Sequence, residues 1–268
     1  MPTQRINDID YHYETAGTGT PVVLLHGFTG SSGNWRGLMA QLAANYRVMA
    51  VDILGHGKTA VFPHPHRYTM PHVAADIAAL LQLLDATPCH LLGYSMGGRL
   101  ALYFAVHYPH LLRSLILESS SPGLAIATER ESRTASDNAL ADRIEREGIL
   151  AFVDYWESIG LFASQKQLET AVRARLRQQR LQNNPVGLAN SLRGMGTGQQ
   201  PSLWDDLPQL ALPTLLIAGE LDSKYVAIGR QMAAQLPNAQ LAIVPDAGHT
   251  VHLERPGQFT ALIAEWLA

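Results

Sequence analysis

Short apolar runs alternate along this chain with longer segments of helical periodicity. The continuous apolar runs begin at Pro21, Tyr46, Cys89, Leu111, Thr214 and Ala239. Runs of this kind are typical of strands buried on both faces of a parallel sheet. Apolar side chains between the second and third runs recur at helical spacing, at Val73, Ile77, Leu80, Leu81 and Leu84. The alternation predicts an α/β fold, a mostly parallel sheet flanked by helices, and the segment YHYE near the start predicts an antiparallel edge strand.

One long region interrupts this alternation. Residues 121–198 contain no strand signal and consist of segments with helical period and propensity. We therefore predict a helical cap over residues 121–198, inserted into a core formed by residues 1–120 and 199–268. The cap ends in the glycine-rich stretch RGMGTGQQPS, for which we expect a flexible loop.

Composition narrows the classes of protein that this chain can represent. The 268 residues are 47% hydrophobic and 16% charged, with a formal net charge of −3, as expected for one compact domain and unlike a nucleic-acid-binding protein. The single cysteine, Cys89, lies in an apolar run and predicts a buried free thiol. No leader and no bilayer-spanning run is evident, so we expect a cytoplasmic protein without stable membrane insertion. The oligomeric state stays open.

The segment GYSMG, residues 93–97, follows one of the apolar runs and precedes a helix-forming segment. This is the context of a nucleophile elbow, in which Ser95 stands on a sharp turn between strand and helix. Gly93 and Gly97 would keep neighbouring Cβ atoms out of that crowded turn. The motif alone is common, but with strand and helix on either side it indicates a nucleophilic serine.

A serine hydroxyl needs a histidine to accept its proton, and the imidazole needs an acid to hold its tautomer. His249 follows the last predicted strand and Asp222 follows the preceding one, so the chain order is serine, aspartate, histidine, as in α/β-hydrolases. Glu118, at the end of LILES, is the alternative acid. The predicted catalytic residues are Ser95, Asp222 and His249.

The loop after the first buried strand reads HGF and supplies an oxyanion-hole amide in this architecture. We predict the Phe28 and Met96 amides as the two donors, and a structural role for His26. His252, three residues after His249, lacks the glutamate of a His-Glu-x-x-His zinc motif and is expected to pack or cap the last helix. The histidines on either side of Pro65 suggest a solvated loop, not a metal site.

The motifs HGF, DILGHG, GYSMGG, GELDSK and DAGH together resemble the α/β-hydrolase superfamily over nearly the whole chain. Dehalogenases and epoxide hydrolases of that superfamily carry an aspartate as nucleophile, which Ser95 excludes. Arg99 stands one helical turn after Ser95, so its guanidinium is positioned to reach the same site. An arginine inside the otherwise apolar MGGRLALYFA favours a function in binding.

The cap sequences, with Tyr94, Arg99 and GELDSKY, resemble the 2-succinyl-6-hydroxy-2,4-cyclohexadiene-1-carboxylate synthases of menaquinone and phylloquinone biosynthesis. The resemblance implies a lyase that eliminates pyruvate from a tricarboxylate substrate, with neither cofactor nor metal. It implies the substrate-binding residues Tyr94, Arg99, Arg133, Trp156, Phe162 and Arg180. Arg130 and Arg177 lie one turn from Arg133 and Arg180, so the register of the two cap arginines stays open.

Two other functions are compatible with the same residues. A carboxylesterase or C–C bond hydrolase would use the same three side chains on a small carboxylate-bearing substrate, through an acyl-serine. A receptor-like relative would bind a small ligand without turnover, and an intact set of Ser95, Asp222 and His249 argues against it.

Overall fold

The computed structural model describes residues 2–268, and its centre is a single eight-stranded sheet. The strands are β1 (Thr3–Ile6), β2 (Ile9–Ala16), β3 (Thr20–Leu25), β4 (Tyr46–Val51), β5 (Cys89–Tyr94), β6 (Leu112–Glu118), β7 (Thr214–Gly219) and β8 (Ala239–Val244). Their order across the sheet is β1-β2-β4-β3-β5-β6-β7-β8. From β4 to β8 every neighbouring pair is parallel, so the α/β class predicted from the apolar runs is confirmed.

The antiparallel side of the sheet differs from the expectation in one respect. The segment YHYE lies in β2, which pairs antiparallel with β4 as predicted but also pairs with β1 on its other side. The edge strand on this side of the sheet is therefore β1, and β8 forms the opposite edge. A two-residue turn at Asn7 and Asp8, with φ of 44° and 67°, joins β1 to β2, and these are residue types that tolerate the left-handed conformation of hairpin turns.

Helices cover both faces of the sheet. They are α1 (Arg36–Leu42), α2 (Met70–Leu83), α3 (Met96–His107), α7 (Ser223–Ala233), α8 (Val251–Glu254) and α9 (Pro256–Leu267), with short 3-10 helices η1 (Ser32–Trp35), η2 (Pro65–Tyr68) and η3 (Pro109–Leu111). The predicted amphipathic helix is α2, and its apolar positions Val73, Ile77, Leu80 and Leu81 are all fully buried.

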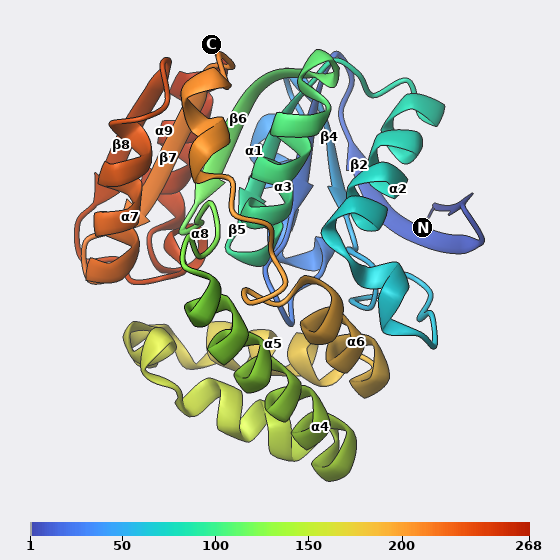
Figure 1. The fold of residues 1–268 in the computed structure, drawn as a ribbon. Coiled ribbons are helices and arrows are strands. Elements are labelled where there is room, and N and C mark those ends of the chain that lie inside the picture. Colours follow the sequence, from blue (N-terminus) through green and yellow to red (C-terminus); the bar gives the residue numbers. More distant parts are fainter. Residues whose placement is uncertain (1) are drawn as a thin grey trace.

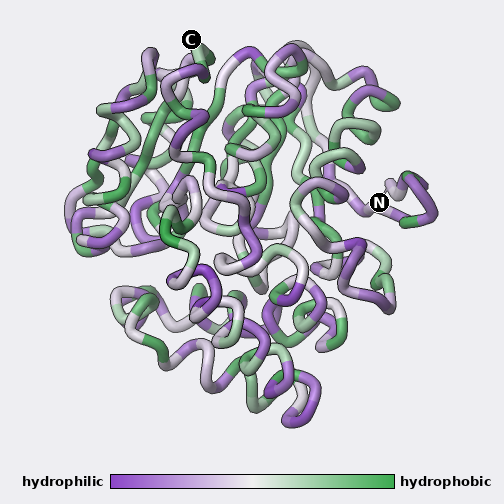
Figure 2. The backbone as a smooth tube through the Cα atoms, viewed as in Figure 1, coloured by the Kyte–Doolittle hydropathy of each residue, from purple (hydrophilic) through white to green (hydrophobic). Residues whose placement is uncertain are grey.

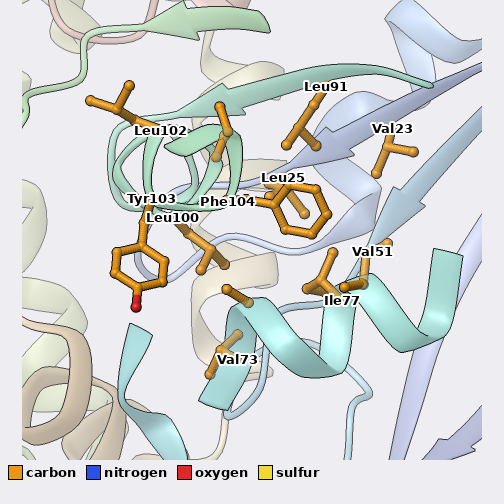
Figure 3. Close-up of a cluster of buried hydrophobic side chains, with 14 of the residues drawn as sticks. Val23, Leu25, Val51, Val73, Ile77, Leu91, Leu100, Leu102, Tyr103 and Phe104 are labelled. Atoms are coloured by element: carbon orange, nitrogen blue, oxygen red, sulfur yellow. The ribbon is translucent and has the colours of Figure 1, made fainter. Parts of the chain in front are cut away.

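Alternate residues of the buried strands face two separate apolar layers, as the pleat of a strand requires. In β3, Val23 and Leu25 pack with residues of α2 and α3, whereas Val22 and Leu24 pack with residues of α1 and α9. Figure 3 shows side chains of α2 and α3 pointing toward those of β3, β4 and β5. Hydropathy along the backbone follows the same arrangement, with apolar strands inside and polar residues concentrated on outer turns (Figure 2).

The segment between β6 and β7 is helical. It contains α4 (Ala127–Ser158), η4 (Gly160–Gln167), α5 (Thr170–Leu181), α6 (Pro185–Met195) and η5 (Trp204–Gln209). In Figure 1 the green to brown helices α4, α5 and α6 lie together beyond one end of the sheet. The carboxyl ends of the parallel strands face this layer, which is where open α/β sheets place a ligand site. The division into core and cap at residues 121–198 stays an interpretation of this arrangement.

The glycine-rich end of this layer is not the flexible loop that its composition suggests. Gly194, Met195 and Gly196 are buried, and the Gln200 side chain is 1% exposed. Gly194 allows the backbone of α6 to approach Tyr68, where an added Cβ would meet atoms at under 3.0 Å. The glycines therefore serve close packing between α6 and the core.

No helix within residues 2–268 is both long and apolar enough to cross a bilayer. The same residues contain no group of three or more histidine, cysteine, aspartate or glutamate side chains arranged to bind a metal ion. Cys89 is a buried free cysteine, as predicted, and burial raises the pKa of its thiol to about 12.

Candidate active site

Ser95 stands at the turn between β5 and α3 with φ of 51° and ψ of −109°. This is a strained conformation for a residue with a Cβ, and such strain is concentrated at functional turns. A Cβ at Gly93 would meet Gly97 and Gly98, and one at Gly97 would meet the carbonyls of Leu25 and His26. The glycines therefore let the helix start close against β5 and the loop after β3, which confirms the steric role predicted for them.

The structure brings Ser95, His249 and Asp222 into one hydrogen-bonded chain. His249 Nε2 lies 3.0 Å from Ser95 Oγ, and His249 Nδ1 lies 2.7 Å from Asp222 Oδ2. A carboxylate accepts hydrogen bonds only, so Nδ1 carries the proton and Nε2 is left to accept the proton of the serine hydroxyl. The geometry is that of a serine activated by a histidine and an oriented acid.

Backbone and helix contacts hold the last two members of this chain in place. Asp222 precedes α7, and its second carboxylate oxygen accepts a hydrogen bond from the Tyr225 amide at 3.4 Å. Glu254 accepts hydrogen bonds from the amides of Gly248 and Thr250, at 2.7 and 3.1 Å, on either side of His249. Sequence reasoning missed Glu254, although it lies five residues after the histidine. The loop that carries His249 is therefore fixed before any ligand arrives.

Glu118, the alternative acid, is paired with a different histidine. Its carboxylate lies 2.7 Å from Nδ1 of His252 and also accepts the His252 amide at 3.0 Å. His252 packs on Trp35 and Tyr94, with ring centroids 4.6 and 4.8 Å apart. The expectation that His252 is a packing residue agrees with these contacts, and Glu118 contributes its backbone carbonyl to the elbow by accepting the Ser95 amide at 2.8 Å.

Phe28 and Met96 both line the same cavity as Ser95. Phe28 belongs to the loop after β3, and Met96 is the first residue of α3, whose first amides have no partner within the helix. His26 supports this loop from behind: its Nε2 accepts the Ile53 amide at 3.0 Å, so its Nδ1 donates to the Gly27 carbonyl at 2.8 Å. The assignment of the Phe28 and Met96 amides to an oxyanion hole stays a prediction.

The cavity above Ser95 lies between the sheet and the helical layer. Among the predicted residues it is lined by Phe28, Tyr94, Ser95, Met96, Arg99, Arg133, Trp156 and Phe162. Its aromatic wall comes from α4 and η4, with Trp156 in edge contact with both Phe28 and Phe162 at ring distances of 5.4 and 5.5 Å. Residues far apart in sequence thus converge on the serine.

Arg99 is the most buried charge on the cavity wall, with 8% of the residue exposed. It donates to the Met195 carbonyl at 2.9 Å and to Gln200 Oε1 at 3.3 Å, and no ion pair to a carboxylate is found for it within residues 2–268. Burial, and to a smaller degree the nearby Arg133 charge, lowers the pKa of its guanidinium to about 10. Arg99 is therefore a protonated, desolvated cation with no carboxylate in direct contact, although the charge of Asp137 lies near enough to raise its pKa slightly.

The cap arginines are already paired. Arg133 forms an ion pair with Asp137 at 2.8 Å and lines the cavity, whereas Arg130 donates to the carbonyls of Leu124 and Ala125 near the start of α4. The structure thus places Arg133, not Arg130, on the cavity wall.

Arg180 lies behind that wall. It is 5% exposed, pairs with Glu157 at 3.1 Å, and sits over the ring of Phe162 at 5.3 Å. Burial lowers the pKa of its guanidinium. Arg177 shares Glu157 with Arg180 and also pairs with Asp154, on a more exposed side of α5. Arg180 is therefore the inward member of the two, but it reaches the cavity through Phe162.

Sequence reasoning missed part of the cavity. Its remaining lining residues come from the start of α7 and the end of α6, together with one residue of η4: Lys224, Tyr225, Ser191, Leu192, Met195, Gly196, Thr197 and Leu161. Lys224 and Tyr225 lie two and three residues after Asp222, so their position near the active site could have been inferred from the sequence. The end of α6 carried no such signal, because its glycine content suggested a loop.

Comparison with known proteins gives consistent similarities. A family model described as the alpha/beta hydrolase fold matches residues 20–256. A Bacillus subtilis (strain 168) protein, provisionally named 2-succinyl-6-hydroxy-2,4-cyclohexadiene-1-carboxylate synthase, is 46% identical over 246 residues, covering 92% of this chain and 89% of that relative. The synthase of that name from Serratia proteamaculans (strain 568) is 35% identical, covering 92% of each chain. The structure of MenH from S. aureus superposes with a TM-score of 0.91 and 35% identity, covering 96% of this chain and 97% of that chain.

Proposed function

We propose a mechanism from the premise that this chain belongs to the α/β-hydrolase family and, within it, to the 2-succinyl-6-hydroxy-2,4-cyclohexadiene-1-carboxylate synthases of menaquinone biosynthesis. It is a lyase that eliminates pyruvate from 2-succinyl-5-enolpyruvyl-6-hydroxy-3-cyclohexene-1-carboxylate. In our proposal Ser95 acts as the base that starts the elimination, made basic by His249 and Asp222. The observation that carries this assignment is the chain of 3.0 and 2.7 Å contacts from Ser95 through His249 to Asp222, opening into a cavity with an unpaired Arg99.

The proposed step breaks one C–H and one C–O bond. As a proton leaves the ring carbon beside the succinyl carbonyl for Ser95 Oγ, the serine proton moves to Nε2 of His249 and Asp222 stabilises the resulting imidazolium. The electron pair shifts through the ring, the C–O bond to the enolpyruvyl group breaks, and the ring becomes a diene. The group leaves as the enolate of pyruvate, and its methylene carbon takes up one proton to give pyruvate, which balances the proton that the ring carbon lost and that His249 gives up to restore the resting site. The Phe28 and Met96 amides would stabilise the negative charge that develops on the succinyl oxygen.

The charges of the site support a substrate with several carboxylates. Burying an anion is costly unless a cation or hydrogen bonds compensate for lost water, and a guanidinium provides both in one planar group. Arg99 and Arg133 line the cavity and are assigned to two of the substrate carboxylates. The third carboxylate is assigned to Arg180, which lies behind the ring of Phe162 and would contact a ligand once that ring moves aside. Arg99 gains most from a ligand, because no carboxylate is in ion-pair contact with it within residues 2–268, whereas Arg133 is paired with Asp137 and Arg180 with Glu157. Tyr94, Trp156 and Phe162 would pack against the ring.

The deciding experiment measures pyruvate with lactate dehydrogenase and NADH, on substrate generated enzymatically in the same cuvette. Wild type should release pyruvate far above the spontaneous rate, and Ser95→Ala should lower the rate by about three orders of magnitude or more, as removal of an activated nucleophile or base usually does. Circular dichroism of Ser95→Ala controls for folding. Release that is unchanged in the variant would refute the role of Ser95 as the base.

The serine-hydrolase alternative uses the same side chains and predicts a different readout. A carboxylesterase would turn over short p-nitrophenyl esters at ordinary enzyme rates through an acyl-serine, while failing to release pyruvate. We expect the opposite pattern. Absence of both activities, with ligand binding retained, would favour the receptor-like function instead.

The proposed compartment is the cytoplasm. Cys89 is the single cysteine of the chain and is a buried free thiol, so the fold needs no disulfide and suits reducing surroundings. The partner of the enzyme in this proposal is its small-molecule substrate.

A further inference from the structure

A chain of buried polar side chains crosses from the helical layer to the elbow. Arg180 Nη2 donates to Gln165 Oε1 at 3.1 Å, Gln165 Nε2 donates to Thr250 Oγ1 at 2.7 Å, and Thr250 Oγ1 lies 3.1 Å from the Tyr94 hydroxyl. The four residues come from α5, η4, the loop after His249, and the end of β5. This is a direct polar connection between the cap and the residues on either side of the catalytic centre.

The direction of the hydrogen bonds follows from the donors available. A guanidinium only donates, so the Gln165 carbonyl must face Arg180 and its NH₂ group must face Thr250. The Thr250 oxygen therefore accepts from Gln165. Its single proton then needs an acceptor, and within residues 2–268 the hydroxyl of Tyr94 is the one in hydrogen-bond range. Tyr94 is left with its own O–H proton to donate, and Tyr94 lines the cavity.

Because these hydrogen bonds are buried, breaking any one of them is costly. Arg180, Gln165 and Thr250 are 5%, 7% and 2% exposed, and a buried polar group that loses its partner costs more than the lost hydrogen bond is worth. Phe162, held under the Arg180 guanidinium, also contacts the ring of His249 at a centroid distance of 6.1 Å. A shift of α5 or η4 would therefore disturb both the Tyr94 hydroxyl and the surroundings of His249.

We propose that Gln165 and Thr250 are positioning residues, which transmit the position of Arg180 in the cap to the Tyr94 hydroxyl and to the loop that carries His249. When the cap is packed on the core as in the structure, the series of hydrogen bonds from Arg180 to Tyr94 is complete. Tyr94 then presents its proton to a ligand, and His249 is held beside Ser95. When the cap shifts, the chain breaks at the Gln165–Thr250 contact, the only link in the series between cap and core side chains. This inference rests on the proposed function and names two further residues that serve it.

The test combines three single variants and one double variant with two readouts. Thr250→Val and Gln165→Leu each remove one link at nearly constant volume, and Thr250→Ser keeps the hydroxyl as the matched control. Pyruvate release should fall about tenfold in kcat for Thr250→Val and for Gln165→Leu, with KM changed less, and the double variant should be no slower than the slower single variant, because both cut the same chain. Thr250→Ser should stay within about twofold of wild type.

The second readout is the rate at which a small fluorophosphonate labels Ser95, measured by mass spectrometry. Serine attack displaces fluoride while His249 takes the serine proton, so this rate reports the placement of His249 whatever the natural substrate is. If wild type is labelled but releases no pyruvate, the proposed function is refuted. The positioning role of Gln165 and Thr250 is then tested by labelling alone, which should be slower in Thr250→Val and in Gln165→Leu. Three results would each overturn the positioning role of Gln165 and Thr250. The losses of kcat could multiply in the double variant, or Thr250→Ser could lose as much kcat as Thr250→Val. The third result is a lowered melting temperature in the variants with unchanged kcat and labelling rate.

Discussion

The cavity has two walls that treat charge differently. The core wall, built from the loop after β3, the end of β5, α3 and the start of α7, carries Ser95 and the unpaired Arg99, and His249 lies behind Ser95. The cap wall, built from α4 and η4 with α5 behind, carries arginines that already hold carboxylates, Arg133 with Asp137 and Arg180 with Glu157. Arginine thus has no carboxylate partner on the core wall and has one on the cap wall.

The difference indicates how each wall serves the ligand. A buried cation without an anion is unfavourable in the empty protein, so an anionic ligand gains the full compensation when it binds Arg99. On the cap wall a ligand carboxylate competes with an existing partner, and the net gain is smaller. The core wall is accordingly expected to determine catalysis and the main anchor, and the cap wall to adjust affinity and position.

The largest effect should come from Asp222→Asn, behind the core wall, where the carboxylate holds His249. An amide in place of the carboxylate favours the wrong tautomer of His249, so kcat for pyruvate release should fall by about three to four orders of magnitude with the fold intact. Steady-state kinetics and circular dichroism measure both.

Glu118→Gln is the matched control, since it changes the other histidine–carboxylate pair by the same single group. It should lower the free energy of unfolding by about 1–3 kcal/mol, from the weakened buried contacts to His252, and leave kcat within about tenfold. If Glu118→Gln reduced kcat as much as Asp222→Asn does, Glu118 would be the acid of the reaction.

Arg99→Met should have the next largest effect. Loss of a charge-assisted contact of about 1.5–3 kcal/mol corresponds to a fall of roughly ten- to 150-fold in kcat/KM. Arg99→Lys keeps the charge but not the planar fork, so it should fall between Met and wild type. Equal kcat/KM in wild type and Arg99→Met would show that the unpaired charge does not serve the ligand.

The cap wall is tested by Arg133→Leu, for which we expect a loss of about tenfold in kcat/KM. The loss is smaller than at Arg99 because Asp137 already compensates the Arg133 charge. Arg130→Leu, one turn earlier and bonded to backbone carbonyls, should leave kcat/KM unchanged. A larger effect at Arg130 than at Arg133 would reverse the register and the comparison of the walls.

The smallest effect concerns pH and the support of the core wall. His56 packs against Phe28, and burial lowers the pKa of its imidazole to about 3, against an ordinary value of 6.5. The unfolded chain binds this proton more readily, so stability is fully present above pH 6.5 and is lost as pH falls toward 3. This group should account for about 1 kcal/mol of unfolding free energy lost between pH 7 and 5.5. Urea denaturation of wild type and His56→Gln at both pH values measures the unfolding free energy. If the free energy falls by the same amount between pH 7 and 5.5 in the two proteins, the prediction for His56 is contradicted.

The elements and motifs that could be predicted from sequence are those that depend on a short stretch of the chain. Six apolar runs mark the strands β3 to β8, because a strand buried on both faces needs continuous apolar residues. The run at Ala239 departs from that reason, since β8 lies at the edge of the sheet and is only partly buried. The turn at Ser95 requires glycines two residues on either side, and the loops after β7 and β8 carry Asp222 and His249. By contrast, β1 is short and polar, with a pattern too weak to distinguish it from a loop. The glycines at the end of α6 suggested flexibility, whereas they serve close packing.

Sequence by itself therefore determined the class of fold, the elbow and the nearest partners of the serine, since the succession of strand and helix patterns and the chemistry of turns are local properties of the chain. Only the tertiary structure decided which histidine Glu118 serves, that Arg99 lacks a carboxylate while Arg133 and Arg180 have one, and that Gln165 meets Thr250 across 85 residues of chain. These pairings depend on where helices of the cap come to rest on the ends of the strands. No spacing along the chain encodes that placement, because it results from packing among segments far apart in sequence.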